Sequence, residues 1–283
     1  MSLPADAFSL PQYAVLRISG PDARTFLQGQ LSCDLDALTP SNLVLGSVNS
    51  PQGRAQAILG LVERTDGIAM IVGSTIAQDA VARLKKYVLR SKVQISLASD
   101  LACYGSTPGV TPYPSTGEGD RHREVDGVSE IAWPRSRTIF IATAKPAENA
   151  EASRAWHAQD IRAGLPQLYP ATRESFVAQM LNLDDLGGIN FEKGCYTGQE
   201  IIARAHFRGA VKRKMYRYAS NAPAPAPGTR VLRSGEHAGD VVDSETTANG
   251  CELLAVVSVE HHATALELES APGAALRKED INR

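Results

Sequence analysis

The stretch Lys193-Gly194-Cys195-Tyr196-Thr197-Gly198-Gln199-Glu200 holds a thiol, a cation, a carboxylate, an amide and two glycines within one short segment. Cysteine reacts as its thiolate, and a nearby ammonium or helix N-terminus lowers the pKa of a thiol. The residues that follow Gly198 favour a helix, with an acid at its start and Arg204 further on. Cys195 and Lys193 are therefore the candidate catalytic residues, in a loop at the positive end of that helix. The alternative is that Cys195 is a small buried apolar side chain.

The composition is that of an ordinary globular protein. Of the 283 residues, 43% are hydrophobic and 21% are charged, and the formal net charge is -2. These values argue against a disordered or fibrous protein, and any affinity for nucleic acid must come from a local patch. The sequence shows neither a basic and apolar leader nor an apolar run of about 20 residues, so neither export nor membrane insertion is predicted.

The cysteines are too far apart in the sequence to indicate a metal site. Cys33, Cys103, Cys195 and Cys251 form no C-x-x-C pair, which argues against a zinc site or a self-contained iron-sulfur site. We therefore predict no metal ligands and expect reduced thiols in a cytoplasmic protein.

Hydrophobic periodicity predicts a mixed α+β fold for the first hundred residues. The order is strand, helix, strand, strand, helix, strand, with an Asp-Gly hairpin signal at residues 65–67. This order favours antiparallel sheets over a doubly wound parallel sheet. The predicted strands are residues 13–19, 54–62, 68–72 and 93–97, and the predicted helices start near Asp22 and span 76–88.

Two breaks divide the rest of the chain. Residues 105–127 are rich in Pro, Gly, Ser and Thr and predict a surface loop or a boundary between two intertwined α+β domains. Strands at 130–133 and 138–143 and a helix over 147–163 follow. The proline-rich segment 221–228 cannot be a helix or a central strand. This segment is the predicted linker between residues 1–220 and a small C-terminal β domain at residues 229–283. Residues 211–219 are a candidate partner for the strands of that domain.

Several blocks of the sequence, in order, carry a resemblance that covers nearly the whole chain. The sequence resembles the YgfZ family, folate-binding proteins related to the aminomethyltransferase (T protein) of the glycine cleavage system. The blocks are residues 18–23, 26–31, 86–93, 162–166, 179–184, 186–191 and 193–200, the last followed by 201–204 and 207–209.

The resemblance implies an aminomethyltransferase-like fold, in which two α+β domains and a C-terminal antiparallel β-barrel surround an opening for tetrahydrofolate or a derivative. It also implies an accessory role in the assembly or repair of iron-sulfur clusters, including those of enzymes that thiolate transfer RNA. Folate and iron-sulfur enzymes or assembly proteins are the implied partners, and tRNA modification is the implied process.

The same resemblance places ligand-binding residues on three segments. Tyr13 and Trp156 stand where the family has aromatic side chains against the ligand, and a flat pterin suits such walls. The loop adds the candidates Tyr196, Gln199, Glu200 and Arg204. For Gln199 and Glu200, capping of the helix from Gly198 is an equal alternative.

The chain departs from the aminomethyltransferases at two acidic positions. Cys195 stands where those enzymes carry an acid, and residues 49–62, which resemble the segment that carries their catalytic aspartate, contain no Asp or Glu. Without a carboxylate to stabilise the developing cation, the sequence favours an accessory protein. The alternative is a folate-dependent aminomethyltransferase or demethylase, with Asp184, Asp185 or Glu192 supplying the acid.

A basic stripe extends over residues 204–217, with six cations and no acid. Candidate partners are a polyglutamate tail, an acidic protein or RNA phosphates, and a third hypothesis makes the whole chain a non-enzymatic module that binds a protein through this stripe. Its aromatic residues Phe207, Tyr216 and Tyr218 favour packing over base stacking, so direct tRNA binding is not predicted. A solvated strand face is the leading alternative. The cations are Arg204, Arg208, Lys212, Arg213, Lys214 and Arg217.

Overall fold

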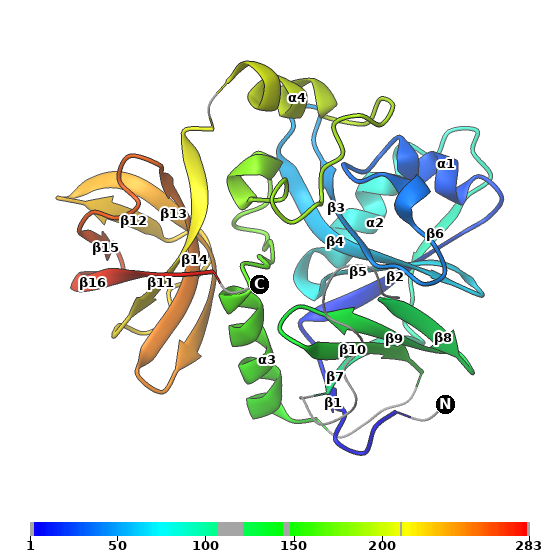
Figure 1. Ribbon diagram of the computed structural model, residues 1–283, viewed down its shortest axis with the longest axis horizontal. Helices are drawn as coiled ribbons and strands as arrows, with labels where there is room; N and C mark the ends of the chain where they lie inside the picture. Colours follow the sequence, from blue (N-terminus) through cyan, green and yellow to red (C-terminus); the bar gives the residue numbers. More distant parts are fainter. Residues whose placement is uncertain (1–2, 107–120, 144–147, 210, 282–283) are drawn as a thin grey trace.

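The described residues form two five-stranded antiparallel sheets and a closed six-stranded barrel (Figure 1). A computed structural model describes residues 3–106, 121–143, 148–209 and 211–281. Within these residues, no helix combines the length and hydropathy needed to cross a bilayer. The arrangement confirms the predicted α+β class with a C-terminal antiparallel barrel.

The first sheet has the strand order β3-β4-β5-β2-β6 and is covered on both faces. In β2, Leu16 and Ile18 enter one core while Val15 enters the other, because successive side chains of a strand point to opposite faces. The strands are β2 (Tyr13–Ser19), β3 (Val44–Asn49), β4 (Ala55–Arg64), β5 (Gly67–Gly73) and β6 (Gln94–Leu97).

Short helices cover one face of this sheet. In α2, residues Ala77, Ala80, Val81 and Leu84 are buried, which is the stripe expected of an amphipathic helix. The helical elements are α1 (Ala23–Gln28), η1 (Leu35–Ala37), η2 (Ser74–Ile76), α2 (Ala77–Lys85) and, from later in the chain, η3 (Ala178–Leu181).

The second sheet, in the order β1-β7-β10-β9-β8, packs against the other face of the first. Ile131 and Ile139 of this sheet share a core with Val15 and Ile71 of the first. The long helix α3 (Ala150–Arg162) closes the core with Trp156. The strands are β1 (Phe8–Ser9), β7 (Ala102–Ser106), β8 (His122–Val125), β9 (Val128–Trp133) and β10 (Arg137–Ala142).

The barrel begins before the proline-rich segment. Its strand β11 pairs with β14 on one side and β16 on the other, which closes the barrel. The segment 221–228 therefore connects two barrel strands, whereas the sequence placed it ahead of a β domain at 229–283. Residues 211–219, the candidate partner, mostly form β11. The strands are β11 (Arg213–Ser220), β12 (Arg230–Arg233), β13 (Glu236–Thr247), β14 (Gly250–Ser258), β15 (Leu266–Leu268) and β16 (Ala271–Glu279).

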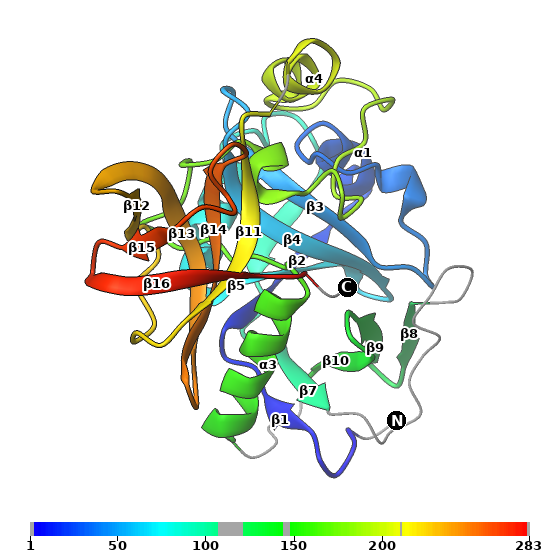
Figure 2. The ribbon, with the colours of Figure 1, turned by 60° about the vertical axis from the view of Figure 1, so that its left-hand side comes forward.

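Helix α3 lies between the barrel and the two sheets (Figure 1 and, turned by 60°, Figure 2) and is attached to the barrel by ion pairs, one buried and one partly exposed. His157 lies between Asp243 and Glu245, with both ring nitrogens 3.0 Å from a carboxylate oxygen. Burial opposes the charged imidazolium, but the two carboxylates outweigh it and raise the pKa of His157 well above its usual value. Five residues further on, Arg162 donates to Glu252 of β14 at 2.6 Å.

Most elements predicted in the first hundred residues are present. The predicted hairpin is one of them, because β4 ends at Arg64 and β5 begins at Gly67. The proposed loop at 105–127 differs. Its ends belong to β7 and β8, and residues 107–120 lie outside the described residues. The short strand β8 was missed because its polar sequence, His-Arg-Glu-Val, carries no apolar alternation.

Candidate functional site

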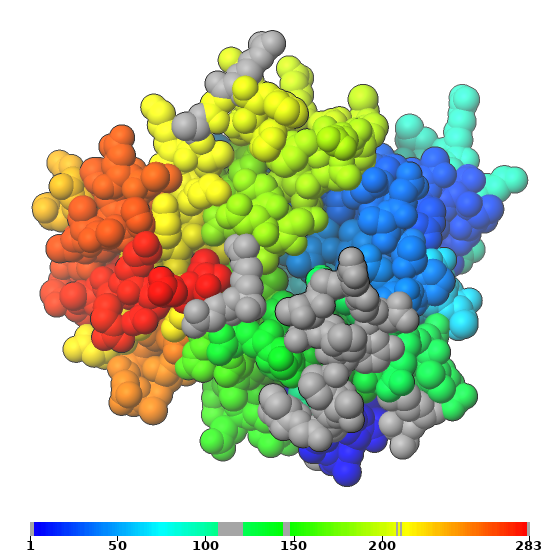
Figure 3. All heavy atoms as spheres, viewed as in Figure 1, coloured from blue at the N-terminus to red at the C-terminus, as the bar shows by residue number. Residues whose placement is uncertain are grey.

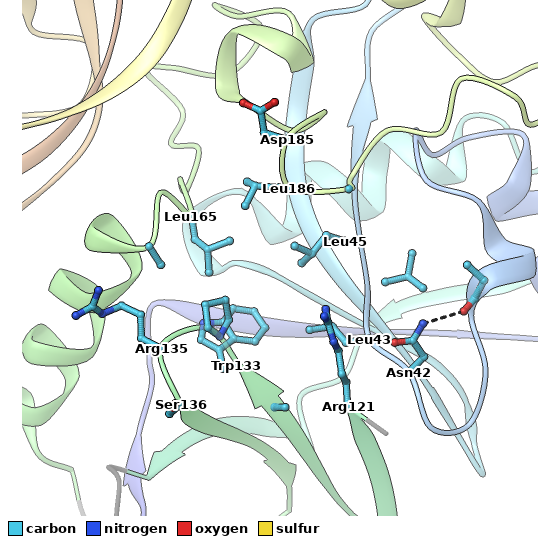
Figure 4. Close-up of a pocket in the computed structure, with 16 residues that line it drawn as sticks. Asn42, Leu43, Leu45, Arg121, Trp133, Arg135, Ser136, Leu165, Asp185 and Leu186 are labelled. Atoms are coloured by element: carbon cyan, nitrogen blue, oxygen red, sulfur yellow. Dashed lines mark hydrogen bonds between the residues drawn. The ribbon is translucent and has the colours of Figure 1, made fainter. Parts of the chain in front are cut away.

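A cavity of about 510 Å³ lies where the two sheets, the end of α3 and the loop at 185–187 meet. Trp133 lies between Arg135 and Arg121, with a group of leucines above it in the view of Figure 4. Asp185 stands at the top of the same view. The leucines are Leu45, Leu165 and Leu186, joined by Leu43 nearer to Arg121. An aromatic ring, an apolar wall and two cations suit a flat ligand with an anionic end.

A buried carboxylate fixes the aromatic ring of this cavity. Asp160 of α3 is fully buried and accepts the indole N–H of Trp133 at 2.9 Å and the hydroxyl of Tyr13 at 2.6 Å. Its charge is balanced by Arg137, whose Nη2 donates at 2.7 Å. Tyr13 packs edge-on against Trp133, with ring centroids 5.9 Å apart. The indole orientation is therefore set before any ligand arrives.

The turn between β9 and β10 carries Arg135 at the rim of the cavity. Arg135 and Ser136 have φ of 64° and 53°, left-handed values that cost a non-glycine residue about 1 kcal/mol or more. Arg135 Nε donates to Gln159 Oε1 of α3 at 2.6 Å, which ties the turn to the helix.

The loop 193–200 packs against the turn that follows α1. The Lys193 ammonium donates to the main-chain carbonyls of Gln28, Leu31 and Cys33 at 2.7, 3.0 and 2.5 Å. Burial lowers the pKa of this ammonium. These three hydrogen bonds of the Lys193 ammonium all go to main-chain carbonyls. They hold the loop 193–200 against the turn that follows α1.

Other side chains of the loop also pack inward. Tyr196 is buried, and burial raises its pKa to about 12. Gln199 Oε1 accepts the Tyr196 amide at 3.3 Å, so Gln199 closes the turn before the helix. Gly198 has a φ of 83°, and a Cβ there would lie 2.5 Å from the Ser50 carbonyl oxygen. Only glycine fits this close approach.

The remaining loop candidates face outward. Cys195, Glu200 and Arg204 are exposed, Cys195 as a free thiol just ahead of α4 (Gln199–Arg208). Helix α4 lies at the top of the molecule in Figure 1, and the yellow-green atoms of this region form the upper edge in Figure 3. Cys195 is thus an accessible thiol in the loop that precedes α4.

None of the eight predicted site residues lines the cavity. Tyr13 lies one layer behind, against Trp133. Trp156 is 2% exposed and belongs to the core, where Arg137 stacks on its ring at 4.3 Å. Its position on the inner face of α3 explains the difference, because that face packs on the second sheet. The chain has two tryptophans, and Trp133, at a strand end next to a basic turn, was the available signal for the cavity.

The basic stripe is partly neutralised in the fold. Arg213 pairs with Asp240 at 2.7 Å, Lys214 with Asp185 at 3.4 Å, and Arg217 with Glu252 at 3.3 Å. The three cations on β11 therefore have carboxylate partners, as expected for a strand surface. Lys214 also reaches the cavity indirectly, since its partner Asp185 lines it.

No family model matches the chain, but similar known proteins share one name. The tRNA-modifying protein YgfZ of Cronobacter sakazakii is 32% identical over 253 residues, 83% of the chain and 75% of that protein. YgfZ of Enterobacter sp. (strain 638) is 34% identical over 254 residues, 83% and 76% respectively.

A solved structure shows the same fold at low sequence identity. The glycine cleavage system aminomethyltransferase T from Bartonella henselae superposes with a TM-score of 0.73 and 14% identity, covering 97% of the chain and 85% of that protein. With a third of the residues shared over most of both chains, the sequence relatives decide the family within this fold: the chain belongs to the YgfZ family.

Proposed function

We propose that this protein binds a reduced folate in the central cavity and serves, as an accessory factor in tRNA modification, the assembly or repair of iron-sulfur clusters. The observation that carries the folate part is the ring of Trp133, fixed by Asp160 beside an apolar wall and two arginines. A reduced folate joins a flat ring system to carboxylates, and these groups match the indole and the cations. The names of the relatives and the fold of the aminomethyltransferase support the same proposal.

The exposure of Cys195 supports a role for its thiol in this assembly or repair. As an exposed free thiol a few residues ahead of α4, it is accessible to a partner and suited to ligate iron of the partner's cluster. Lys193 is then a positioning residue, because its ammonium binds main-chain carbonyls.

Ligand binding tests the cavity directly. Tetrahydrofolate at about one hundred times its dissociation constant should stabilise the protein by about 2.7 kcal/mol in thermal unfolding. Trp133→Ala should weaken binding by about tenfold or more, because it removes the aromatic wall. Phe207→Ala is the matched control, since Phe207 is 68% exposed on α4. Equal affinity in the wild type and Trp133→Ala would place the ligand elsewhere, and no stabilisation of the wild type would end the folate proposal.

Complementation of a strain that lacks the protein tests the thiol. We expect Cys195→Ala to leave iron-sulfur enzymes that thiolate tRNA with about a tenth or less of their wild-type activity, as when a reactive group is removed outright. Cys103→Ala is the control, because that thiol is buried in the second sheet. Full restoration of tRNA thiolation by Cys195→Ala would exclude the thiol mechanism.

One observation keeps aminomethyl transfer as a second candidate. Asp185 brings a carboxylate to the cavity wall, although residues 49–62 contain none. Conversion of tetrahydrofolate to its methylene form by an S-aminomethyl thiol, with release of ammonia and the free thiol and with turnover lost in Asp185→Asn, would establish this candidate; absence of turnover would exclude it.

A further inference from the structure

We infer that residues 85–92, here called the basic loop, form a docking surface for a protein partner with an acidic surface and an apolar recess, and that this partner is the iron-sulfur enzyme of the proposed function. The inference rests on that function and deepens it, because it says where the partner is held while the Cys195 thiol reaches its cluster. The loop follows α2, and none of its residues lines the cavity.

The basic loop carries four exposed cations and no acid. Residues 80–99 contain neither Asp nor Glu. The helix dipole favours cations at the end of α2, which accounts for the first two of the four, but the other two lie beyond the helix. A patch of this kind attracts an acidic surface and speeds association with it. The cations are Lys85, Lys86, Arg90 and Lys92.

The acids around the basic loop do not neutralise it. Asp79 and Asp100, which flank the acid-free stretch, pair with arginines outside the loop. Asp22 contacts the loop through the main-chain amide of Lys92, which donates to its carboxylate at 2.6 Å. Within the part of the chain that the structure describes, none of the four cations forms an ion pair with a carboxylate. Their charges are therefore available to a partner.

The basic loop also holds a leucine out in solvent. Leu89 is 87% exposed, more than any other large apolar side chain of the described residues. Its neighbours are fixed, since Val88 packs against the core that α2 covers and Arg83 lies 4.0 Å from the ring centre of Tyr87. An exposed leucine gains free energy on binding only where the partner offers an apolar recess. Phosphates offer none, so the loop suits an acidic protein better than a nucleic acid.

The basic loop and the loop 193–200 lie at the two ends of α1. Ahead of α1, the Asp22 carboxylate accepts the Lys92 amide, and at its end the Gln28 carbonyl accepts the Lys193 ammonium. The six residues of α1 span about 9 Å, whereas an interface of standard size covers about 800 Å² on each protein, a patch about 30 Å across. In Figure 3 the yellow-green atoms ahead of α4 and the cyan atoms after α2 both reach the upper edge. One partner can therefore contact both loops.

The test is binding of a purified tRNA-thiolating iron-sulfur enzyme, with its cluster in place, followed by biolayer interferometry. Leu89→Ala should weaken binding by about tenfold, mainly through faster dissociation, because the apolar anchor is lost. Lys86→Gln combined with Arg90→Gln should weaken binding by about tenfold in dilute buffer, mainly through slower association, and by about twofold near 0.5 M salt.

Matched controls come from the barrel region. Val259→Ala changes an apolar side chain that is 40% exposed, and Arg233→Gln changes an exposed cation on β12. Both should keep the wild-type affinity and rates. Because the altered side chains of the basic loop are exposed, the loop variants should unfold at the wild-type temperature.

Three outcomes would overturn the inference. If the wild type does not bind the enzyme, the docking surface is wrong, and the proposed function is judged by folate titration and complementation. If the enzyme binds the wild type and the loop variants equally, it docks elsewhere and the proposed function stands. If the loop variants weaken binding of unmodified tRNA and leave enzyme binding unchanged, the loop binds RNA. Conversely, weaker enzyme binding by the loop variants together with full complementation by Cys195→Ala would keep the docking surface and exclude the thiol mechanism.

Discussion

Replacing Asp160 with alanine should lower the free energy of unfolding by about 3 to 5 kcal/mol, because it leaves the buried guanidinium of Arg137 without its carboxylate. The side chains of Arg137 and Asp160 are only 4% and 0% exposed. The same change removes the acceptor of the Trp133 N–H and the Tyr13 O–H. Urea unfolding at neutral pH, followed by far-ultraviolet circular dichroism, measures the loss.

Two further variants test which property of Asp160 matters: its negative charge or its buried position. Asp160→Asn keeps an oxygen for Trp133 and should fold, but with a less fixed indole and weaker folate binding. Asp100→Ala removes a carboxylate that is 54% exposed and paired with Arg17, so its cost should stay below about 1 kcal/mol. If Asp160→Ala costs no more than Asp100→Ala, Asp160 does not anchor the cavity wall.

Lys193→Met should cost about 3 kcal/mol of unfolding free energy, since three main-chain carbonyls lose a charged donor inside the protein. Methionine keeps the length of the apolar stem, so the loss reports on the ammonium. Thermal and urea unfolding, compared with the wild type, measure this effect.

Cys195→Ala is the matched control from the same loop. Its thiol is exposed, so its stability should lie within about 0.5 kcal/mol of the wild type. Wild-type stability in Lys193→Met would mean that the ammonium is not structural, and would restore Lys193 as a candidate for activating the thiol. With the expected result, a loss of function in Lys193 variants is explained by folding.

The sequence predicted the elements of the fold better than the cavity. Local alternation identifies β2 and the β4–β5 hairpin because those signals lie within a few residues. The cavity is assembled from segments near residues 44, 134, 164 and 186, and no local pattern says that these meet. The family resemblance indicated Trp156, which is buried in the core, and the sequence alone does not say whether a tryptophan on a helix faces the core or a pocket.

The loop 193–200 shows a second limit. Its residue types suggested one reactive cluster, yet the backbone divides them: Lys193 and Tyr196 point inward, while Cys195 faces solvent. A one-residue step in a turn reverses the direction of a side chain, and sequence spacing alone does not determine that direction. The thiol remains a candidate because of where it lies.

Helix α3 connects the barrel directly to the ring of Trp133. Within six positions it presents His157 and Arg162 to the barrel and Asp160 to the indole of Trp133. The barrel therefore cannot shift against the two sheets without either moving α3 or breaking one of these contacts, and movement of α3 would disturb the hydrogen bond that orients the indole.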